Sequence, residues 1–411
     1  MKKFFLILFL CIITIPLTSY ADDNLEDEIE IDLKTIETAS NIEEIPEINA
    51  KHSVVIDRNS KTVLYGKQEY EKCKMASTTK IMTAIVVIEN CNLSDKVKIS
   101  SNSASTGGSR LGLAKNDEIT VEHLLYGLML RSGNDAAVAL AEYAGGTVDE
   151  FINMMNKKAS DLSLSSTHFV TPHGLDDEEH YTTAYELACL TDYALRNDIF
   201  AKIVNTKSFT ININSNPKTL TNTNELLGSF EGVYGVKTGF TNGANRCLVT
   251  ACKRNNIDVI CVVLGCDTKR LRTSDSVKLL NYTLKNFITV NVKDIIEKEF
   301  EKWYILHSNS FSINKGKSQL MELYFAENEL PYEKLTINKE NVNKIENEIL
   351  YNQNLSSPIS ENSIIGTLNF KVSNKEYFTI NIKNSNEIKK KDIYDYLNIM
   401  FKNYFEYLMQ K

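Results

Sequence analysis

The feature that most constrains the fold is a helix-rich stretch enclosed between strand-like segments. On its N-terminal side, "SVVID" and "KTVLYG" alternate around Arg58-Asn59-Ser60, which predicts a β-hairpin. Alanine- and leucine-rich helical sequence follows from Ser77 to about Tyr143. Strands are then predicted at three segments, Tyr234–Phe240, Cys247–Cys252 and Val259–Gly265. A helix from Ser274 to about Phe287 follows them. Strands from both ends of the stretch can join one sheet, so we expect a mixed domain of helices and sheet.

The sequence changes character around Val290. Short alternating stretches such as "LMELYF" and "YFTINIK" predict a small, separate β domain. In the tail, apolar residues recur at helical spacing: Ile393, Leu397, Met400, Phe401, Tyr404 and Leu408. A helix packed on its own domain and a helix lying in a membrane surface both fit this pattern. The tail carries too many charges to span a membrane.

The N-terminus predicts the compartment. Lys2 and Lys3 precede an apolar run, Phe4–Leu17, and Ser19-Tyr20-Ala21 supplies small residues before a cleavage point, which is the layout of a secretory signal peptide. A retained membrane anchor is the alternative, although the run is short for a spanning helix. We expect a chain secreted across the cytoplasmic membrane that works outside the cytoplasm. The acidic, aromatic-poor residues 22–49 predict a flexible spacer.

The net charge and the cysteine pattern argue against two kinds of ligand, nucleic acid and zinc. The formal net charge of −7 argues against nucleic acid, because phosphate binding needs a basic surface. Of the eight cysteines, four lie in two apolar runs: Cys247, Cys252, Cys261 and Cys266. Their spacing does not match a zinc site, whose ligand pairs are about two to four residues apart. They are interpreted as small core residues, with disulfides left open.

Three short motifs indicate nucleophilic chemistry. "MASTTKIM" places Ser77 three residues before Lys80, at a predicted helix start. The same Ser-x-x-Lys spacing recurs at Ser215–Lys218 and Ser312–Lys315, so it is weak alone. It is joined, however, by Ser132-Gly133-Asn134 between two predicted helices and by Lys237-Thr238-Gly239 on a predicted strand. The three in this order form a much rarer set.

The residue types in this set suit a serine nucleophile. A serine hydroxyl needs a base to take its proton, and residues i and i+3 share a helix face, so Lys80 can reach Ser77. Burial and a second cation disfavour a charged lysine, and Lys237 is a candidate for that cation. A serine at a helix N-terminus also offers its own backbone N–H to a developing oxyanion.

The set resembles that of the active-site-serine penicillin-recognising enzymes. Its separations resemble the low-molecular-mass D-alanyl-D-alanine carboxypeptidases, as do "LMLRSGNDAAVALAEYAGG", "THFVTPHGLDDEEHYTTAYELA" and "GVKTGFTNGANRCLV". The resemblance is strong over about residues 50–285 and looser beyond. It implies an α+β fold in which an antiparallel sheet flanked by helices is followed by a small all-β domain and an amphipathic helix. The expected divisions are signal peptide 1–21, spacer 22–49, catalytic domain 50–289, β domain 290–388 and tail helix 389–411.

The resemblance also implies a role for each motif residue. Ser77 would be the nucleophile, Lys80 the general base and Ser132 a proton relay to the leaving amine. Asn134 would hold the substrate's peptide carbonyl, while Lys237 and Thr238 would bind its terminal carboxylate. Gly239 would permit close approach of the peptide, and the backbone N–H of Phe240 would complete the oxyanion hole.

The expected reaction is hydrolysis of the terminal D-Ala-D-Ala bond of peptidoglycan stem peptides, with β-lactams acylating the same serine. No metal or cofactor is implied, and 389–411 is a candidate contact with the membrane surface. Transpeptidase or endopeptidase action stays open, and so does an inactive wall-binding scaffold. A β-lactamase is disfavoured because the chain has Ser-Gly-Asn and no Glu-x-x-Leu-Asn segment. His168 and His173 are expected to be structural or surface residues rather than members of a Ser–His–Asp triad.

Overall fold

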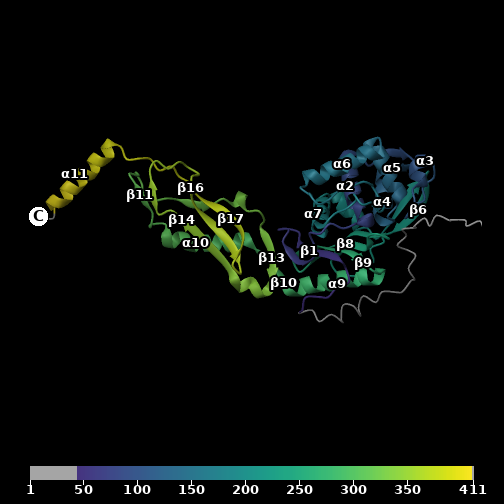
Figure 1. Ribbon diagram of the computed structural model, residues 1–411. Coiled ribbons are helices and arrows are strands. Elements are labelled where there is room, and N and C mark those ends of the chain that lie inside the picture. Colours follow the sequence, from purple (N-terminus) through teal and green to yellow (C-terminus); the bar gives the residue numbers. More distant parts are fainter. Residues whose placement is uncertain (1–43, 410–411) are drawn as a thin grey trace, which may run out of the picture.

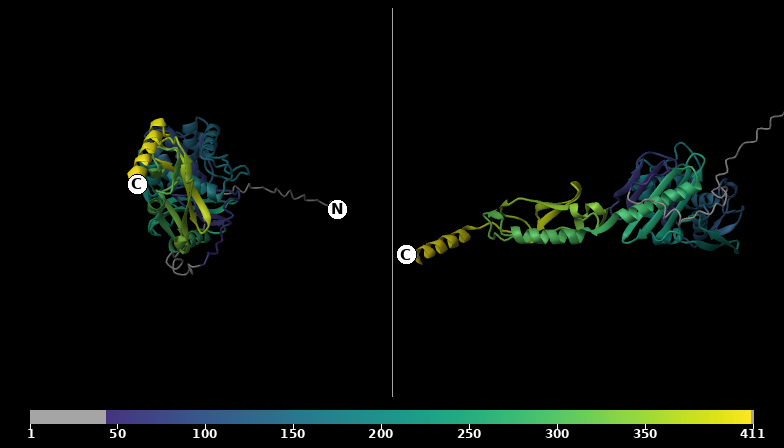
Figure 2. Two further views of the ribbon diagram at one scale, coloured as in Figure 1. Left: turned by 90° about the vertical axis from the view of Figure 1, so that its left-hand side faces the viewer. Right: turned by 90° about the horizontal axis from the view of Figure 1, so that it is seen from below.

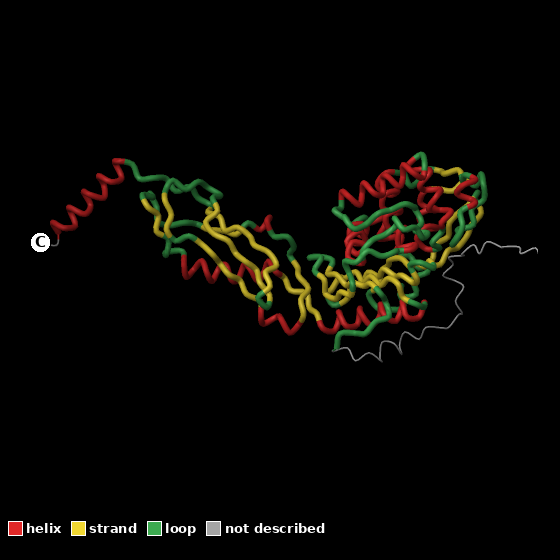
Figure 3. Tube along the Cα trace, in the orientation of Figure 1, coloured by secondary structure: helices red, strands yellow, loops and turns green. Residues whose placement is uncertain are grey.

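The computed structural model of the chain describes residues 44–409 (Figure 1). Two bodies and a terminal helix follow one another along an elongated molecule, as the perpendicular views also show (Figure 2). Helices dominate the first body and strands the second (Figure 3). The predicted signal peptide and most of the predicted spacer lie outside the described residues.

The first body is built on a five-stranded sheet in the order β2-β1-β9-β8-β7, with every neighbouring pair antiparallel. Its strands are β1 (His52–Asp57), β2 (Val63–Lys67), β7 (Val233–Thr241), β8 (Asn245–Arg254) and β9 (Ile257–Cys266). The predicted hairpin and the three later strands are therefore confirmed. Because β1 pairs with β9, the two ends of the helix-rich stretch meet in one sheet, and β7 is left at its edge.

Helices cover both faces of this sheet (Figure 1). The central helix is α2 (Lys80–Asn90), in which every residue from Lys80 to Ile88 is buried, as expected for a helix packed on all sides. The remaining elements of this body are β3 (Lys96–Lys98), α3 (Ser101–Ser105), β4 (Glu118–Thr120), α4 (Val121–Leu130), α5 (Asn134–Gly145), α6 (Val148–Asp161), α7 (Ala184–Leu195), α8 (Asp198–Val204), β5 (Ser208–Ile213), β6 (Asn216–Thr221) and α9 (Lys269–Asn286).

Strand β8 shows how the two faces are filled. Cys247, Val249 and Ala251 belong to the core shared with the helices around α2, whereas Leu248 and Cys252 belong to the core beneath α9. This is the two-residue alternation of a strand buried on both faces. The four cysteines of β8 and β9 are buried, and the described residues contain no disulfide. Burial raises the pKa of Cys252 to about 12. The interpretation of these cysteines as core residues holds.

The second body has its own core around a four-stranded antiparallel sheet in the order β12-β17-β16-β14. Its elements are β10 (Phe287–Asn291), α10 (Val292–His307), β11 (Ser312–Asn314), β12 (Leu323–Phe325), η2 (Glu327–Glu329), β13 (Lys334–Asn338), η3 (Lys339–Lys344), β14 (Ile345–Tyr351), β15 (Asn354–Ser356), β16 (Ile364–Val372) and β17 (Lys375–Asn384). The structure adds α10, which the sequence analysis did not anticipate. Val292, Ile296 and Phe300 are its buried residues, at a spacing of four.

The terminal helix α11 (Ile393–Met409) stands apart from the second body (Figures 1 and 2). None of its residues is buried, so the predicted helix forms but does not pack on its own domain. Lys317 pairs with Asp392 and Asp395 at its start, at 2.8 and 2.9 Å. Among the described helices, none is both long and apolar enough to cross a membrane.

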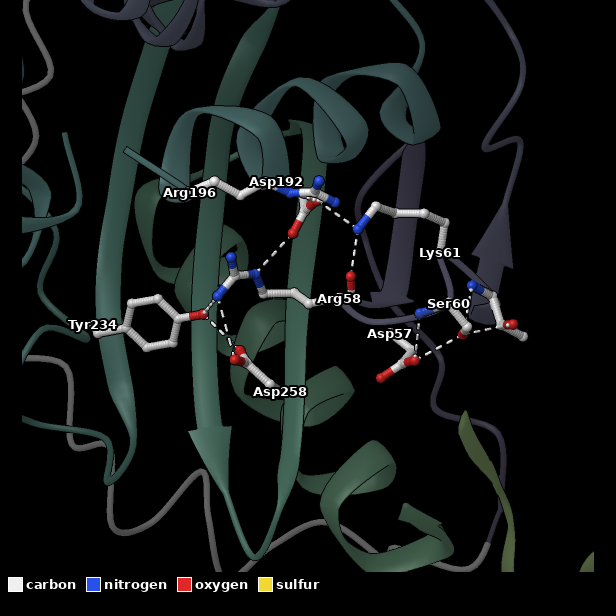
Figure 4. A network of polar contacts seen from close by, with 9 residues as sticks. Asp57, Arg58, Ser60, Lys61, Asp192, Arg196, Tyr234 and Asp258 are labelled. Atoms are coloured by element: carbon white, nitrogen blue, oxygen red, sulfur yellow. Dashed lines mark hydrogen bonds and ion pairs between the residues drawn. The ribbon is translucent and has the colours of Figure 1, made fainter. Parts of the chain in front are cut away.

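A polar network joins the two bodies at the tip of the β1–β2 hairpin. Thr336 on β13 donates to the buried Asp57 carboxylate at 2.8 Å. The next residue, Arg58, contacts Asp192 on α7 at 3.0 Å, the Tyr234 hydroxyl on β7 at 2.9 Å and Asp258 at 3.3 Å (Figure 4). The hairpin tip therefore ties α7 and β7 to each other and lies directly against the second body.

Candidate active site

The first motif lies where a tight turn enters the central helix. Ser77 belongs to the 3₁₀ turn η1 (Ala76–Thr79), and the α-helix itself starts at Lys80. The Lys80 Nζ lies 2.7 Å from the Ser77 Oγ. The sequence predicted a helix start at Ser77, and the structure places the α-helical residues three positions later because the first turn is tighter. The spacing of three brings the two side chains together in either geometry.

Lys80 is fully buried without a carboxylate in contact. Its Nζ also donates to the Asn134 Oδ1 at 2.8 Å and to the His173 backbone carbonyl at 2.9 Å. Burial is the largest cause that holds the pKa of Lys80 well below its usual value, and the charge of Lys237 adds to it. Asp135 acts in the opposite direction but is outweighed.

The second motif lies in the three-residue junction between α4 and α5. Ser132 is 8% exposed and has a φ of 61°, a conformation that non-glycine residues seldom adopt. Asn134 begins α5, and its side-chain amide donates to the Gly107 carbonyl at 2.8 Å as well as accepting from Lys80. The end of the junction therefore brings the Asn134 side chain against Lys80, with Ser132 two residues before it.

The third motif runs along the edge strand β7, beside the Ser77 turn. Lys237 is 1% exposed, and the Thr238 hydroxyl lies 2.8 Å from the hydroxyl of Thr223. A Cβ placed on Gly239 would lie only 3.1 Å from the Ser77 backbone nitrogen. A side chain at this position would crowd the backbone of the turn, so glycine favours the close passage of β7. The ring of Phe240 lies under the Arg246 guanidinium, 3.6 Å from the ring centroid.

The loop before α7 contributes main-chain atoms rather than imidazole rings. Burial lowers the pKa of His173 to about 3 and that of His180 to about 4, so both rings are neutral at pH 7. The His180 Nε2 bonds the Thr79 hydroxyl at 2.7 Å, while His173 reaches Lys80 through its carbonyl. Sequence reasoning missed this carbonyl. The sequence feature beside it was Gly174. Its φ of +88° and the 1.9 Å distance from a built Cβ to the Ala76 oxygen exclude a side chain at this position.

The structure thus brings Ser77, Lys80 and Asn134 into direct contact and places β7 against the Ser77 turn. The other Ser-x-x-Lys pairs lie elsewhere: Lys218 is on β6 with Ser215 just before it, and Ser312 begins β11 with Lys315 just after it. Within residues 44–409, no group of three histidine, cysteine or acidic side chains could hold a metal ion. The arrangement is that of a serine nucleophile with a buried amine, suited to acyl transfer.

Two family models match the chain. The model described as D-alanyl-D-alanine carboxypeptidase matches residues 39–268, and the model for the C-terminal domain of penicillin-binding protein 5 matches residues 300–390. The D-alanyl-D-alanine carboxypeptidase DacF of Bacillus subtilis is 36% identical over 327 residues, covering 78% of this chain and 80% of its own. DacA of Escherichia coli is 30% identical over 423 residues, covering 98% of each chain.

The solved structures give the same result. Penicillin-binding protein 5 of Haemophilus influenzae superposes with a TM-score of 0.69 at 28% identity, over 84% of this chain and 99% of its own. The chain belongs to the D-alanyl-D-alanine carboxypeptidase family of penicillin-binding proteins. It is a serine-type carboxypeptidase that acts on peptidoglycan stem peptides and binds β-lactams. The expected α+β fold, with its C-terminal β domain and final helix, is confirmed.

Proposed function

We propose that Ser77 is the acyl-enzyme nucleophile and that Lys80 is its general base. The three contacts of the Lys80 Nζ carry this proposal. A neutral amine has two N–H groups and one lone pair. The Asn134 Oδ1 and the His173 carbonyl accept the two N–H groups, which directs the lone pair to the Ser77 hydroxyl. The lowered pKa of Lys80 favours this neutral form more than in a solvent-exposed lysine.

In the proposed reaction, the Ser77 Oγ gives its proton to Lys80 and bonds the carbonyl carbon of the penultimate D-alanine. The backbone N–H groups of Ser77 and Phe240 receive the oxyanion, supported by the close passage of β7 along the turn. The C–N bond then breaks, and Ser132 relays the proton from Lys80 to the amine of the leaving D-alanine. Water finally cleaves the ester and regenerates Ser77.

The remaining motif residues would hold the peptide. The second N–H of the Asn134 amide would donate to the substrate's peptide carbonyl, since the first donates to Gly107. Lys237 and Thr238 would bind the terminal carboxylate. Gly239 lies on an edge strand, to which an extended peptide can add as a further strand. A substrate lying along β7 would present its carbonyl to Ser77.

We also propose the setting in which the enzyme works. A signal peptide at 1–21 would send the chain across the cytoplasmic membrane, and 22–49 would be a spacer. The catalytic domain would be 50–289, the β domain 290–388 and the tail helix 389–411. The exposed apolar side chains of α11, such as Phe401, Phe405 and Met409, support a role for this helix at the outer membrane surface.

Transpeptidation is the second candidate. The DD-transpeptidase of Streptomyces K15 is 37% identical and superposes with a TM-score of 0.56, over 58% of this chain. An acceptor amine in place of water would convert the same acyl-enzyme into a cross-linked peptide. This differs from hydrolysis only in the second step.

The test is mass spectrometry of a peptide ending in D-Ala-D-Ala after incubation with the protein, with and without an amine acceptor. The Ser77→Ala variant is compared with Ser312→Ala, which alters another Ser-x-x-Lys serine. We expect loss of one alanine with the wild type and S312A and none with S77A. Turnover by S77A would refute Ser77 as nucleophile, and a product carrying the acceptor would favour transpeptidation.

A further inference from the structure

The loop from Gly107 to Leu113 is fastened to the start of α5, next to the second motif. The Asn134 backbone N–H donates to the Ser109 carbonyl at 2.8 Å, and its side-chain amide donates to the Gly107 carbonyl at the same distance. Asn134 also holds Lys80. The position of this loop is therefore coupled to that of the proposed base.

Asp135, the next residue, forms the strongest attachment of this loop. Its carboxylate is fully buried and accepts three consecutive backbone N–H groups, those of Leu111 at 2.7 Å, Gly112 at 2.7 Å and Leu113 at 3.0 Å. The Arg110 guanidinium lies 4.0 Å away and is partly exposed. A buried carboxylate satisfied by a row of amides fixes both the loop and the helix start that carries it.

The other side of the loop is also fixed. The Leu111 carbonyl accepts from the Lys218 Nζ at 2.5 Å. Its buried side chain lies so close to α4 that a Cβ on Gly127 would be 2.4 Å from Leu111 Cδ2. Lys218 belongs to one of the repeated Ser-x-x-Lys pairs, and this contact gives that lysine a structural explanation. If the Asp135 contacts are lost, the loop therefore stays attached to Lys218 and α4, and the start of α5 loses its strongest attachment to it.

We propose that Asp135 is a positioning residue for acylation: by binding the Leu111–Leu113 amides, it holds Asn134 against Lys80 and fixes the junction that carries Ser132. Ser132 has a rare backbone conformation, which persists only where its surroundings enforce it. Asp135 lies three residues beyond Ser132, at the first turn of α5. This inference rests on the proposed roles of Ser77 and Lys80.

The charge of Asp135 has a second consequence. The charged groups that act on Lys80 are Lys237 from β7, which lowers its pKa, and Asp135 from α5, which raises it. The ring of His173, from the loop before α7, is neutral. Replacing Asp135 with asparagine removes the raising charge, so Lys80 loses its proton at lower pH. A substitution that only loosened the loop, without removing a charge that acts on Lys80, would not have this effect.

The experiment measures the rate of covalent labelling of the full chain by a fluorescent penicillin across pH, comparing Asp135→Asn with Asp117→Asn. Asp117 is the matched control because its carboxylate accepts from Ala114 N at 2.7 Å, just beyond the end of this loop. We expect D135N to lower the plateau rate by about tenfold to a hundredfold, the scale of a small misplacement. We also expect its acid limb to move down by about one pH unit. D117N should match the wild type.

A D135N plateau within twofold of the wild type would overturn the positioning role, and an unmoved acid limb would overturn the effect of the Asp135 charge on Lys80. If D135N does not fold, Lys218→Met provides the test, since it loosens the same loop without altering the charge contributed by Asp135. K218M should lower the plateau and leave the limb in place, and an unchanged plateau would refute the positioning role. Failure of the wild type itself to label would instead count against the proposed function.

Discussion

Lys80 and Arg58 are two basic residues of the first body in opposite surroundings. Lys80 contacts a hydroxyl, an amide oxygen and a main-chain carbonyl, with a second cation nearby, and its pKa is lowered. Burial would also lower the pKa of Arg58, but Tyr234, Asp258 and Asp192 outweigh it and raise the value. A basic side chain buried with little opposing charge can act as a base, whereas one buried among carboxylates stays charged and holds neighbouring elements together.

The largest effect is expected from removing the amine of Lys80. Lys80→Met keeps an unbranched apolar side chain of similar shape, lacks only the terminal amine position, and cannot accept the Ser77 proton. Penicillin labelling should slow by about 10²–10⁴-fold, the range of a lost general base. Stopped-flow or gel-based labelling would measure this. Lys315→Met, in the third Ser-x-x-Lys pair, is the control, and K80M labelling within tenfold of the wild type would contradict the role.

Breaking the ion pairs of Arg58 should lower the stability of the fold rather than the rate of acylation. Asp192→Asn leaves Arg58 and Lys61 without their shared carboxylate, which lies 3.0 and 2.5 Å from them. We expect a loss of about 2–3 kcal/mol in unfolding free energy, because Arg58 is 18% and Lys61 26% exposed and the ions are partly screened. Urea denaturation would measure it, with the exposed Asp198→Asn as control.

The same variant has a defined pH dependence. The three surrounding cations hold the pKa of Asp192 below its usual value despite burial, which acts to raise it. Its stabilisation is therefore complete above the unfolded pKa of about 3.9 and is lost as pH falls through the lower folded pKa. Wild type and D192N should converge in stability once the pH falls below the folded pKa of Asp192. A constant difference at all pH values would show that the ion pairs are not its source.

A change at Lys237 tests whether a neighbouring charge sets the pKa of Lys80. Its charge is the second cause of the lowered pKa of Lys80, after burial. Lys237→Gln should therefore raise that pKa and move the acid limb of penicillin labelling up by about one pH unit, opposite to the direction expected for D135N. The KM for a D-Ala-D-Ala peptide should also rise, since its carboxylate loses a cation. A limb that stays in place would exclude the electrostatic role.

The smallest effect is expected at His173. Its carbonyl bonds Lys80, while its ring nitrogen Nδ1 accepts from the Leu175 amide at 3.2 Å. Asparagine can supply an acceptor at a similar place, so His173→Asn should change penicillin labelling by less than about threefold, as expected where no side-chain group takes part in proton transfer. A loss comparable to that of K80M would instead identify the imidazole as a participant.

The sequence predicted the elements that depend on local pattern. The hairpin of β1 and β2 was predicted from alternation, and β8 and β9 from continuous apolar runs. The spacing of Ser77 and Lys80 follows from helix geometry. The exposed apolar face of α11 was also visible in its spacing. In the second body, α10 was missed because its buried positions, Val292, Ile296 and Phe300, are few among charged residues.

The missed parts of the site share a different cause. The Lys80 contact with residue 173 uses a main-chain carbonyl, so the identity of that side chain carries no signal. Asp135 binds amides 22 to 24 residues earlier, and nothing local marks such a partner. The repeated Ser-x-x-Lys pairs could be separated from Ser77–Lys80 only by their lack of companion motifs. Long-range packing, which brings α5, the loop and α2 together, supplied the rest.

The attachment of α11 has a consequence for the geometry of the whole molecule. Beyond Lys391, whose amide bonds the Lys315 carbonyl, exposed ion pairs of Lys317 hold the first turn. Such pairs contribute about 0–1 kcal/mol and weaken as ionic strength rises. The angle between α11 and the second body is therefore adjustable rather than rigidly fixed. The height and tilt of the catalytic domain above any surface that α11 grips would vary with the salt around it.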